Sequence, residues 1–163
     1  VFVKLLDSKK IKPETHDGFE TTDGDHSSVS LALQKMIQSQ NSYIGAYEMT
    51  NPEFMRMIVY VLKLAERNHQ NVIVKLFSIE SVTGERLQGE ALYRAGALLR
   101  NAINSRIRNT DITTPYSMTK RLVLFMNMKP ENEGDVVSKI EENFEKLDEE
   151  CMYKLYAEDI VLK

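Results

Sequence analysis

The alternation of hydrophobic and polar positions divides the chain into two unequal parts. Residues 1–7 alternate as a short strand does, a polar segment with Pro and Gly follows, and residues 28–39 carry one apolar stripe at helical spacing. Beyond residue 43 the apolar segments become longer and more regular. We therefore predict a strand, a linker and a linker helix over residues 1–43, and a separate domain over residues 44–163.

Within the second part the pattern changes repeatedly between the period of a helix and that of a strand. Asn51 followed by Pro52 is typical of a helix start, so we expect Asn51 to cap a helix at 52–67. Further helices are predicted at about 89–107 and from Asp135 to Leu147, after a loop at 129–134. Strands are predicted at 72–79, 112–116, 122–128 and 153–161, with a turn at 117–120.

From residue 71 onward the order is strand, helix, strand, strand, helix, strand. This order is typical of the α+β class with a ferredoxin-like βαββαβ core, in which helices cover one face of an antiparallel sheet. We expect the extra helix at 52–67 to join the same helical layer. The nearly continuous apolar run at 72–79 is typical of a central strand buried on both faces.

Composition excludes several classes of function. The formal net charge is −3 without a basic block, so the segment has no electrostatic footprint for nucleic acid. No apolar run reaches the ~20 residues that span a bilayer, and the single Cys151 suits a reducing cytoplasm. Because the chain begins with Val1 and lacks a signal-peptide pattern, we expect a piece of a longer cytoplasmic protein.

Two short stretches invite a chemical interpretation. The sequence Asp-Gly-Asp-His at 23–26 groups possible metal ligands, but a hard metal needs more oxygen ligands at fixed spacing, so we interpret it as a turn before a helix. His69 lies in a predicted exposed turn without a nucleophile or paired acid nearby. We therefore expect no metal, no cofactor and no nucleophile–base set.

The strand at 72–79 and the helix after it resemble part of the GGDEF domain of bacterial diguanylate cyclases. In that family the first strand ends in an Asp-x-Asp pair that holds Mg²⁺ on GTP, and the matching residues here are Ser78 and Glu80. Gly89 and Glu90 match the Gly-Asp pair that opens the family's next helix. The resemblance covers roughly residues 45–163.

The predicted hairpin carries the most specific part of this resemblance. Arg108 and Asp111 match an RxxD pair that binds cyclic di-GMP as an inhibitor in many family members. After five intervening residues, the GGDEF signature itself is replaced by Ser117, Met118, Thr119, Lys120 and Arg121. Metal-assisted phosphoryl transfer needs carboxylates around Mg²⁺. The replacements therefore imply a degenerate domain that is not an enzyme.

A narrower resemblance concerns degenerate GGDEF-like domains that follow receiver or DNA-binding modules in regulators of gut Firmicutes. They are similar in a Gly-Ala-Tyr before the helix, here Gly45 to Tyr47, and in a Tyr-Ser turn, here Tyr116 and Ser117. The resemblance implies a bacterial response-regulator type of protein. Its partners would be other domains of a longer regulatory chain or a second copy in a homodimer. Exposed methionines such as Met55 and Met118 could line the interface with such a partner.

Three functional interpretations remain open at this point. The first is a non-catalytic signal-transduction domain that acts through protein–protein or interdomain contacts. The second is a cyclic di-GMP receptor that uses Arg108 and Asp111, because a guanidinium binds phosphate or a guanine edge and a carboxylate accepts from guanine N–H groups. The third is a GTP- or nucleotide-binding regulatory domain that uses Lys120 and Arg121, although two cations in an exposed turn are usually only solvated.

Overall fold

The computed structural model describes residues 26–40 and 45–161, and the chain divides into the units Val1–Asn41 and Ser42–Lys163. The first unit contributes α1 (His26–Gln40), which includes the helix predicted at 28–39. The strand predicted at 1–7 and most of the Asp-Gly-Asp-His turn lie outside the described residues. Among the helices that the structure describes, none is long and apolar enough to cross a membrane.

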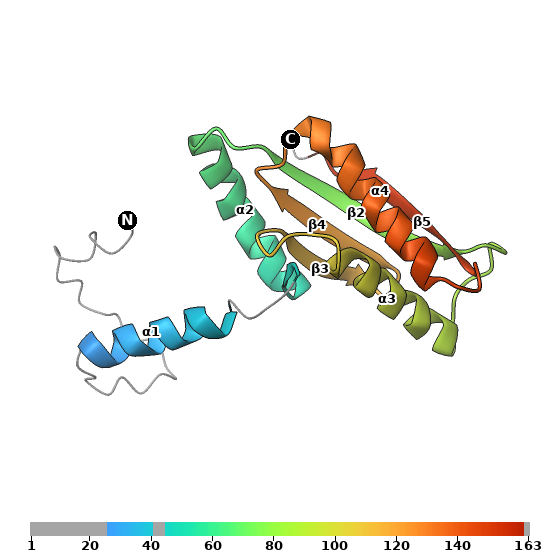
Figure 1. The fold of residues 1–163 in the computed structure, drawn as a ribbon, viewed down its shortest axis with the longest axis horizontal. Coiled ribbons are helices and arrows are strands. Elements are labelled where there is room, and N and C mark those ends of the chain that lie inside the picture. The colour runs from blue at the N-terminus through green and yellow to red at the C-terminus, as the bar shows by residue number, and fades with distance from the viewer. Residues whose placement is uncertain (1–25, 41–44, 162–163) are drawn as a thin grey trace. The chain divides into compact units, whose positions relative to one another are not determined.

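The second unit is built on a five-stranded sheet in the order β1-β3-β4-β2-β5 (Figure 1). Strands β2, β3, β4 and β5 pair antiparallel and form the predicted ferredoxin-like core, which confirms the α+β fold class. The short β1 adds a parallel strand beside β3, which the sequence did not predict. The elements are β1 (Tyr47–Glu48), α2 (Asn51–Arg67), β2 (Val72–Ser81), α3 (Gly89–Asn104), β3 (Ile112–Ser117), β4 (Lys120–Met126), α4 (Pro130–Leu147) and β5 (Tyr153–Asp159).

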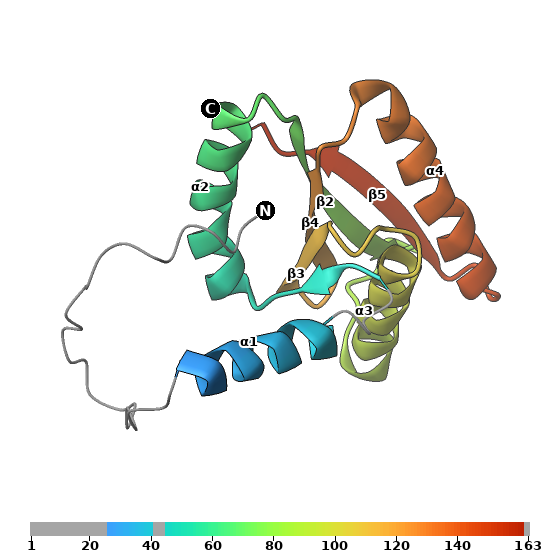
Figure 2. The same cartoon turned by 60° about the vertical axis from the view of Figure 1, so that its left-hand side comes forward.

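Helices cover both faces of this sheet, so the expectation of a single helical layer is wrong. Figure 2 shows α2 on one side of the strands and α3 and α4 on the other. Phe77 and Val123 pack in the core with α3 and α4, whereas Val74 and Leu124 pack with Phe54 of α2. Because successive residues of a strand point to opposite faces, β2 and β4 supply both cores at once.

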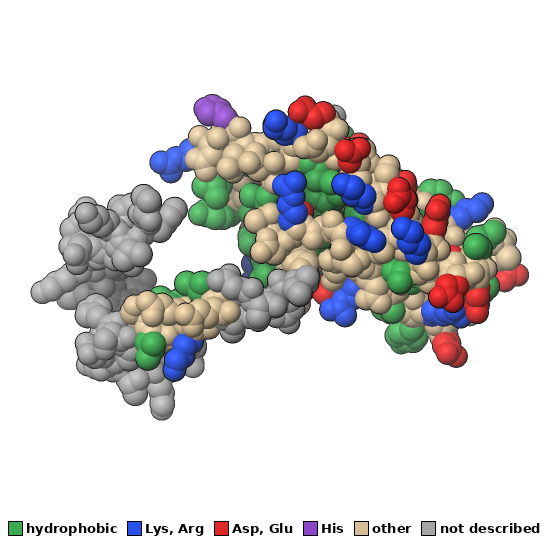
Figure 3. All heavy atoms as spheres, in the orientation of Figure 1, with side chains coloured by type: hydrophobic (Ala, Val, Ile, Leu, Met, Phe, Trp, Pro, Cys, Tyr) green, Lys and Arg blue, Asp and Glu red, His purple; other side chains and the backbone are tan. Residues whose placement is uncertain are grey.

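The central strand also carries a buried charge, Lys75, among its apolar residues. Its ammonium group forms ion pairs with Glu133 of α4 and, at 2.6 Å, with Asp159 of β5. Burial alone would lower the pKa of Lys75, but the hydrogen bonds to Asp159 and Glu133 outweigh burial and raise it. The pair of carboxylates therefore keeps Lys75 charged and ties α4 and β5 to β2. Figure 3 shows further side chains of both signs over α3 and α4.

The starts of two helices differ from the prediction by short distances. The cap of α2 is Thr50 and not Asn51; its backbone N–H donates to the Glu53 carboxylate at 3.0 Å and its hydroxyl donates at 2.7 Å. Helix α4 begins at Pro130, inside the predicted loop, and not after Asp135. A proline at the first position of a helix loses no hydrogen bond, so Pro130 indicates a helix start in the same way as Pro52 does.

The β3–β4 turn lies directly on α3. A methyl group built at Gly96 of α3 would stand 2.6 Å from the carbonyl oxygen of Met118. Glycine at this position therefore allows the turn backbone to approach the helix closely. The contact fixes the turn that contains the residues matched to the signature.

We expect Gly96→Ala to destabilise the domain by about 1–3 kcal/mol, because the added methyl group displaces the turn from α3. Gly134→Ala is the matched control, since nothing lies within 4 Å of a methyl group built at this α4 position. Alanine has a better helix propensity than glycine, so Gly134→Ala should stabilise the domain by about 0.5–1 kcal/mol. Chemical denaturation of both variants measures the difference, and equal stabilisation of both would show that the turn does not need this contact.

Candidate functional site

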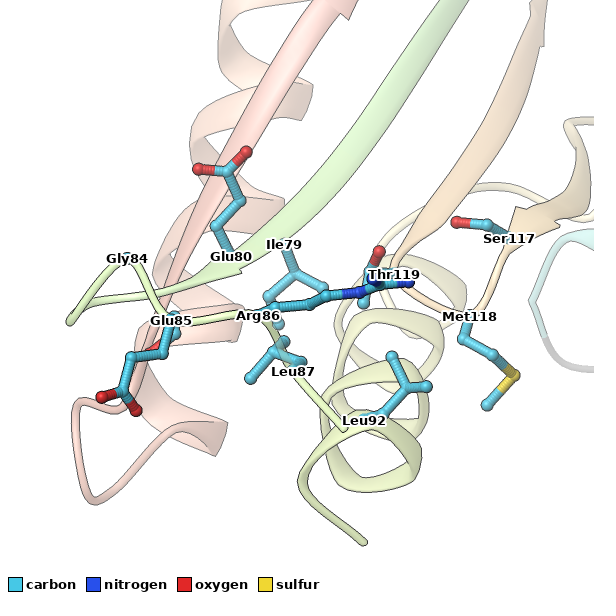
Figure 4. A pocket seen from close by; sticks show the side chains of 11 residues that line it. Ile79, Glu80, Gly84, Glu85, Arg86, Leu87, Leu92, Ser117, Met118 and Thr119 are labelled. Carbon is cyan, nitrogen blue, oxygen red and sulfur yellow. The ribbon is translucent and has the colours of Figure 1, made fainter. Parts of the chain in front are cut away.

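The candidate site is a cleft of about 560 Å³ at the end of β2. This volume lies within the range of pockets that hold small molecules. Its walls come from the end of β2, the loop before α3, the first turns of α3 and the β3–β4 turn (Figure 4). The lining residues are Ile79, Glu80, Ser81, Gly84, Glu85, Arg86, Leu87, Leu92, Ser117, Met118 and Thr119.

The structure brings together four of the residues that were matched to the family's active site. Glu80 lines the cleft from the end of β2, and Ser117, Met118 and Thr119 line it from the turn. The other three do not line it. Ser78 is buried in β2, where it pairs with Lys120 of β4 and Tyr156 of β5. Lys120 is exposed, and Arg121 is buried.

The charged side chains of the cleft are arranged unfavourably for a metal ion. In Figure 4 the Arg86 side chain extends across the cleft toward the turn, while the carboxylates of Glu80 and Glu85 point outward and away from each other. The turn contributes hydroxyl groups and a thioether but no carboxylate. Within residues 26–40 and 45–161, no group of three or more His, Cys, Asp and Glu residues could hold a metal ion. The residues present therefore do not fit the Mg²⁺ that the resemblance would imply.

Arg121 is buried in β4, where it forms a partly buried ion pair, and does not lie in an exposed turn as expected. Its side chain is 7% exposed, and its Nη2 donates to Oε1 of Glu48 in β1 at 2.6 Å. Its Nε donates to the Thr113 hydroxyl at 3.4 Å. Arg100 of α3 donates to the other oxygen of Glu48, from Nε at 2.9 Å and from Nη2 at 2.6 Å. We call Glu48, Arg100 and Arg121 the β1 ion-pair cluster.

The carboxylate of this cluster keeps its charge to a lower pH than an ordinary glutamate. Partial burial would raise the pKa of Glu48, but hydrogen bonds and charge attraction from Arg121 and Arg100 lower it below its ordinary value. A carboxyl group whose pKa is lower in the folded than in the unfolded state stabilises the fold above its unfolded pKa. The cluster should therefore lose its contribution as the pH falls from about 4.5 through the lower folded value.

We expect Glu48→Gln to lower the free energy of unfolding by about 2 kcal/mol, because the buried Arg121 loses its counter-charge. The part of the stability that the natural chain loses as the pH falls below about 4.5 should also disappear. Glu48→Gln combined with Arg121→Met should recover most of the loss, since no buried charge remains unpaired. Denaturation at several pH values measures both effects. Additive losses in the double variant would contradict the coupling.

The two residues of the RxxD pair differ in exposure, because Asp111 is buried and Arg108 is exposed. Asp111 is 3% exposed, and its two oxygens accept from the backbone N–H of Arg108 at 3.0 Å and of Met126 at 3.2 Å. Burial raises the pKa of Asp111 even though these backbone donors and the Arg108 charge favour the carboxylate. Arg108 is exposed, and its guanidinium makes no hydrogen bond or ion pair within the described part of the chain.

Three residues that form the ion-pair cluster or the cleft could not be predicted from the sequence. Glu48 and Arg100 form the β1 ion-pair cluster with Arg121, and Arg86 extends into the cleft. Glu48 and Arg121 are separated by 73 positions, so local periodicity gives no signal for their contact. Arg121, by contrast, had a usable signal. It precedes Val123 and Phe125 at strand spacing, which places all three on one face of β4.

Solved structures are similar to this chain at low sequence identity. A diguanylate cyclase (DGC) protein from Thermotoga maritima is 14% identical, with 71% of this chain and 82% of that chain covered and a TM-score of 0.44. Diguanylate cyclase SiaD in complex with its activator SiaC, from Pseudomonas aeruginosa, is 10% identical, with 83% of this chain covered and a TM-score of 0.57.

This chain spans 59% of the SiaD chain. No protein-family profile and no curated protein matches the chain. At this level of identity the likeness concerns the fold, and it confirms the expected GGDEF-like architecture.

Proposed function

We propose that the domain is a non-catalytic signal-transduction module that acts through contacts with other domains or proteins. The observation that carries the proposal is the composition of the turn side of the cleft. Ser117, Met118 and Thr119 supply it, and none of them offers a carboxylate to a metal ion. Phosphoryl transfer depends almost entirely on positioning and on metal charge, so a cleft without converging carboxylates lacks its main catalytic element.

The cationic residues of the former signature give no substitute for the metal. The buried Arg121 side chain bonds to Glu48 and Thr113, and it would have to leave both partners to reach a nucleotide. Lys120 remains exposed beside it, but a single exposed ammonium is a flexible point charge. This arrangement supports the non-catalytic proposal over a GTP-binding role that uses both residues.

Exposed apolar side chains support a role in contacts. On α2, Met55 is 56% and Tyr60 is 66% exposed, and beside the cleft Tyr116 is 63% and Met118 45% exposed. Aromatic residues and Met are enriched where proteins bind each other. The fold itself offers a precedent, because SiaD is a diguanylate cyclase in complex with an activator protein.

We expect the purified chain to release no pyrophosphate from GTP with Mg²⁺ or Mn²⁺, because its cleft cannot hold the metal against the triphosphate. Anion-exchange chromatography of the nucleotides and a coupled pyrophosphate assay measure this, with an active diguanylate cyclase as the positive control. Turnover that exceeds buffer and disappears in Thr119→Ala would show that the degenerate turn is still catalytic.

A cyclic di-GMP receptor is the alternative, and the burial of Asp111 disfavours it. We expect calorimetric titration with cyclic di-GMP to show no binding that depends on Arg108, so Arg108→Ala should leave the titration unchanged. The reason is that the Asp111 carboxylate already accepts hydrogen bonds from two backbone donors. Arg106→Ala is the control for the loss of an exposed arginine in the same segment. Micromolar binding that Arg108→Ala abolishes and Arg106→Ala preserves would establish the receptor role in place of the contact role.

A further inference from the structure

Strand β5 forms an edge of the sheet, and among the described strands it pairs only with β2. The hydrogen bonds at the two ends of this pairing show which residues face inward. The N–H of Ile160 donates to the carbonyl of Val74 at 2.9 Å, and the N–H of Val82 donates to the carbonyl of Met152 at 3.0 Å. In an antiparallel pair the bonded residues alternate, so the even-numbered residues of β5 direct their backbone groups to β2.

The odd-numbered residues of β5 therefore present their backbone groups at the outer edge. The first of them is already occupied, because the N–H of Tyr153 donates to the Asp148 carboxylate at 2.9 Å. The N–H and carbonyl groups of Leu155, Ala157 and Asp159 remain outward and without a strand partner among the described residues. Such a row of groups is a template for an added strand.

A groove of about 360 Å³ runs beside this edge, between β5 and α4. The half-buried Leu155 contributes apolar surface above the buried Phe144, and Glu141 and Glu145 are exposed acids that line the α4 side. Lys154 also lines the groove, but it alternates with Leu155 and directs its side chain to the opposite face of the sheet. Figure 3 shows acidic side chains along α4.

We propose that this edge and groove bind an extended segment of a partner protein that carries Lys or Arg at alternate positions. The segment adds a strand to β5, and its basic side chains enter the groove beside Glu141 and Glu145. Its main-chain groups pair with the outward groups of residues 155–159. This inference names the kind of partner and rests on the proposed contact role.

A second copy of this chain fits the same edge less well. Pairing of β5 with the β5 of another copy around a two-fold axis would place the two α4 helices on the same side of the joined sheet. Glu141 and Glu145 of each copy would then face those of the other. Like charges opposite each other are destabilising, whereas a basic segment meets the same acids favourably.

The test uses two fluorescently labelled peptides, Thr-Lys-Val-Lys-Val-Lys-Thr and Thr-Glu-Val-Glu-Val-Glu-Thr, titrated with the full chain in an anisotropy assay. We expect the lysine peptide to bind about tenfold more tightly than the glutamate peptide. Glu141→Gln with Glu145→Gln should remove that preference. Raising the salt concentration should weaken the binding of the lysine peptide but not that of the glutamate peptide, because salt screens the attraction between exposed charges.

The backbone part of the proposal is tested at Ala157. Ala157→Pro removes one outward N–H without touching the inward bonds of the even-numbered residues, and it should weaken lysine-peptide binding by about tenfold. Ala157→Val retains the N–H and is the control, with binding expected to be unchanged. Thermal unfolding checks that both variants fold. If Ala157→Pro does not fold, the Glu141→Gln and Glu145→Gln variant decides the question by itself.

Three results would overturn the proposal. They are no binding of the lysine peptide up to about 1 mM, equal binding of both peptides, and sedimentation showing a dimer that Ala157→Pro dissociates. The last result would make a second copy the occupant. None of these results bears on GTP turnover, so the peptide proposal can fail while the non-catalytic assignment stands.

Discussion

The burial of β2 on both faces and along both edges is the constraint on which the rest of the domain depends. Its residues pair with β4 on one side and β5 on the other. Phe77 and Ile79 require cover from α3 and α4, and Val74 requires cover from α2. A strand with apolar residues on both faces cannot lie at the surface of a two-layer fold. Helix α2, which precedes the ferredoxin-like core, is therefore required by the fold. It covers the face of the sheet that α3 and α4 leave open.

The same constraint determines where the cleft lies. Beyond Ile79 the strand leaves the covered interior, and Glu80 is already exposed. The loop after β2 and the β3–β4 turn meet at this end of the strand, and Gly96 lets the turn rest on α3. The position of the cleft therefore follows from the fold itself. From the turn, Ser117, Met118 and Thr119 line this cleft and offer no carboxylate.

The sequence predicted the elements well because their periodicities are strong, and it predicted the arrangement less well because arrangement depends on non-local contacts. The apolar run of β2 and the stripe of α3 identify a central strand and a covering helix without further information. The apolar stripe of α2 shows that one face is buried, but a stripe does not say against which side of a sheet it packs. The parallel pairing of Tyr47 with Ile112 is equally non-local. In the site, the turn residues could be located by their spacing, whereas Arg86 could not.

Arg121 has a structural role in the observed fold. It occupies the place that resembles the last residue of the signature, on the face of β4 that also carries Val123 and Phe125. A guanidinium buried there requires a carboxylate, and Glu48 of β1 is the residue that supplies it. The strand by which the chain enters the domain is thereby coupled to the strand that follows the turn. A force or rotation that moves β1 must either carry β4 with it or leave the buried Arg121 without its carboxylate partner. Catalysis has no need of this link, but a module that transmits a signal through contacts depends on links of this kind.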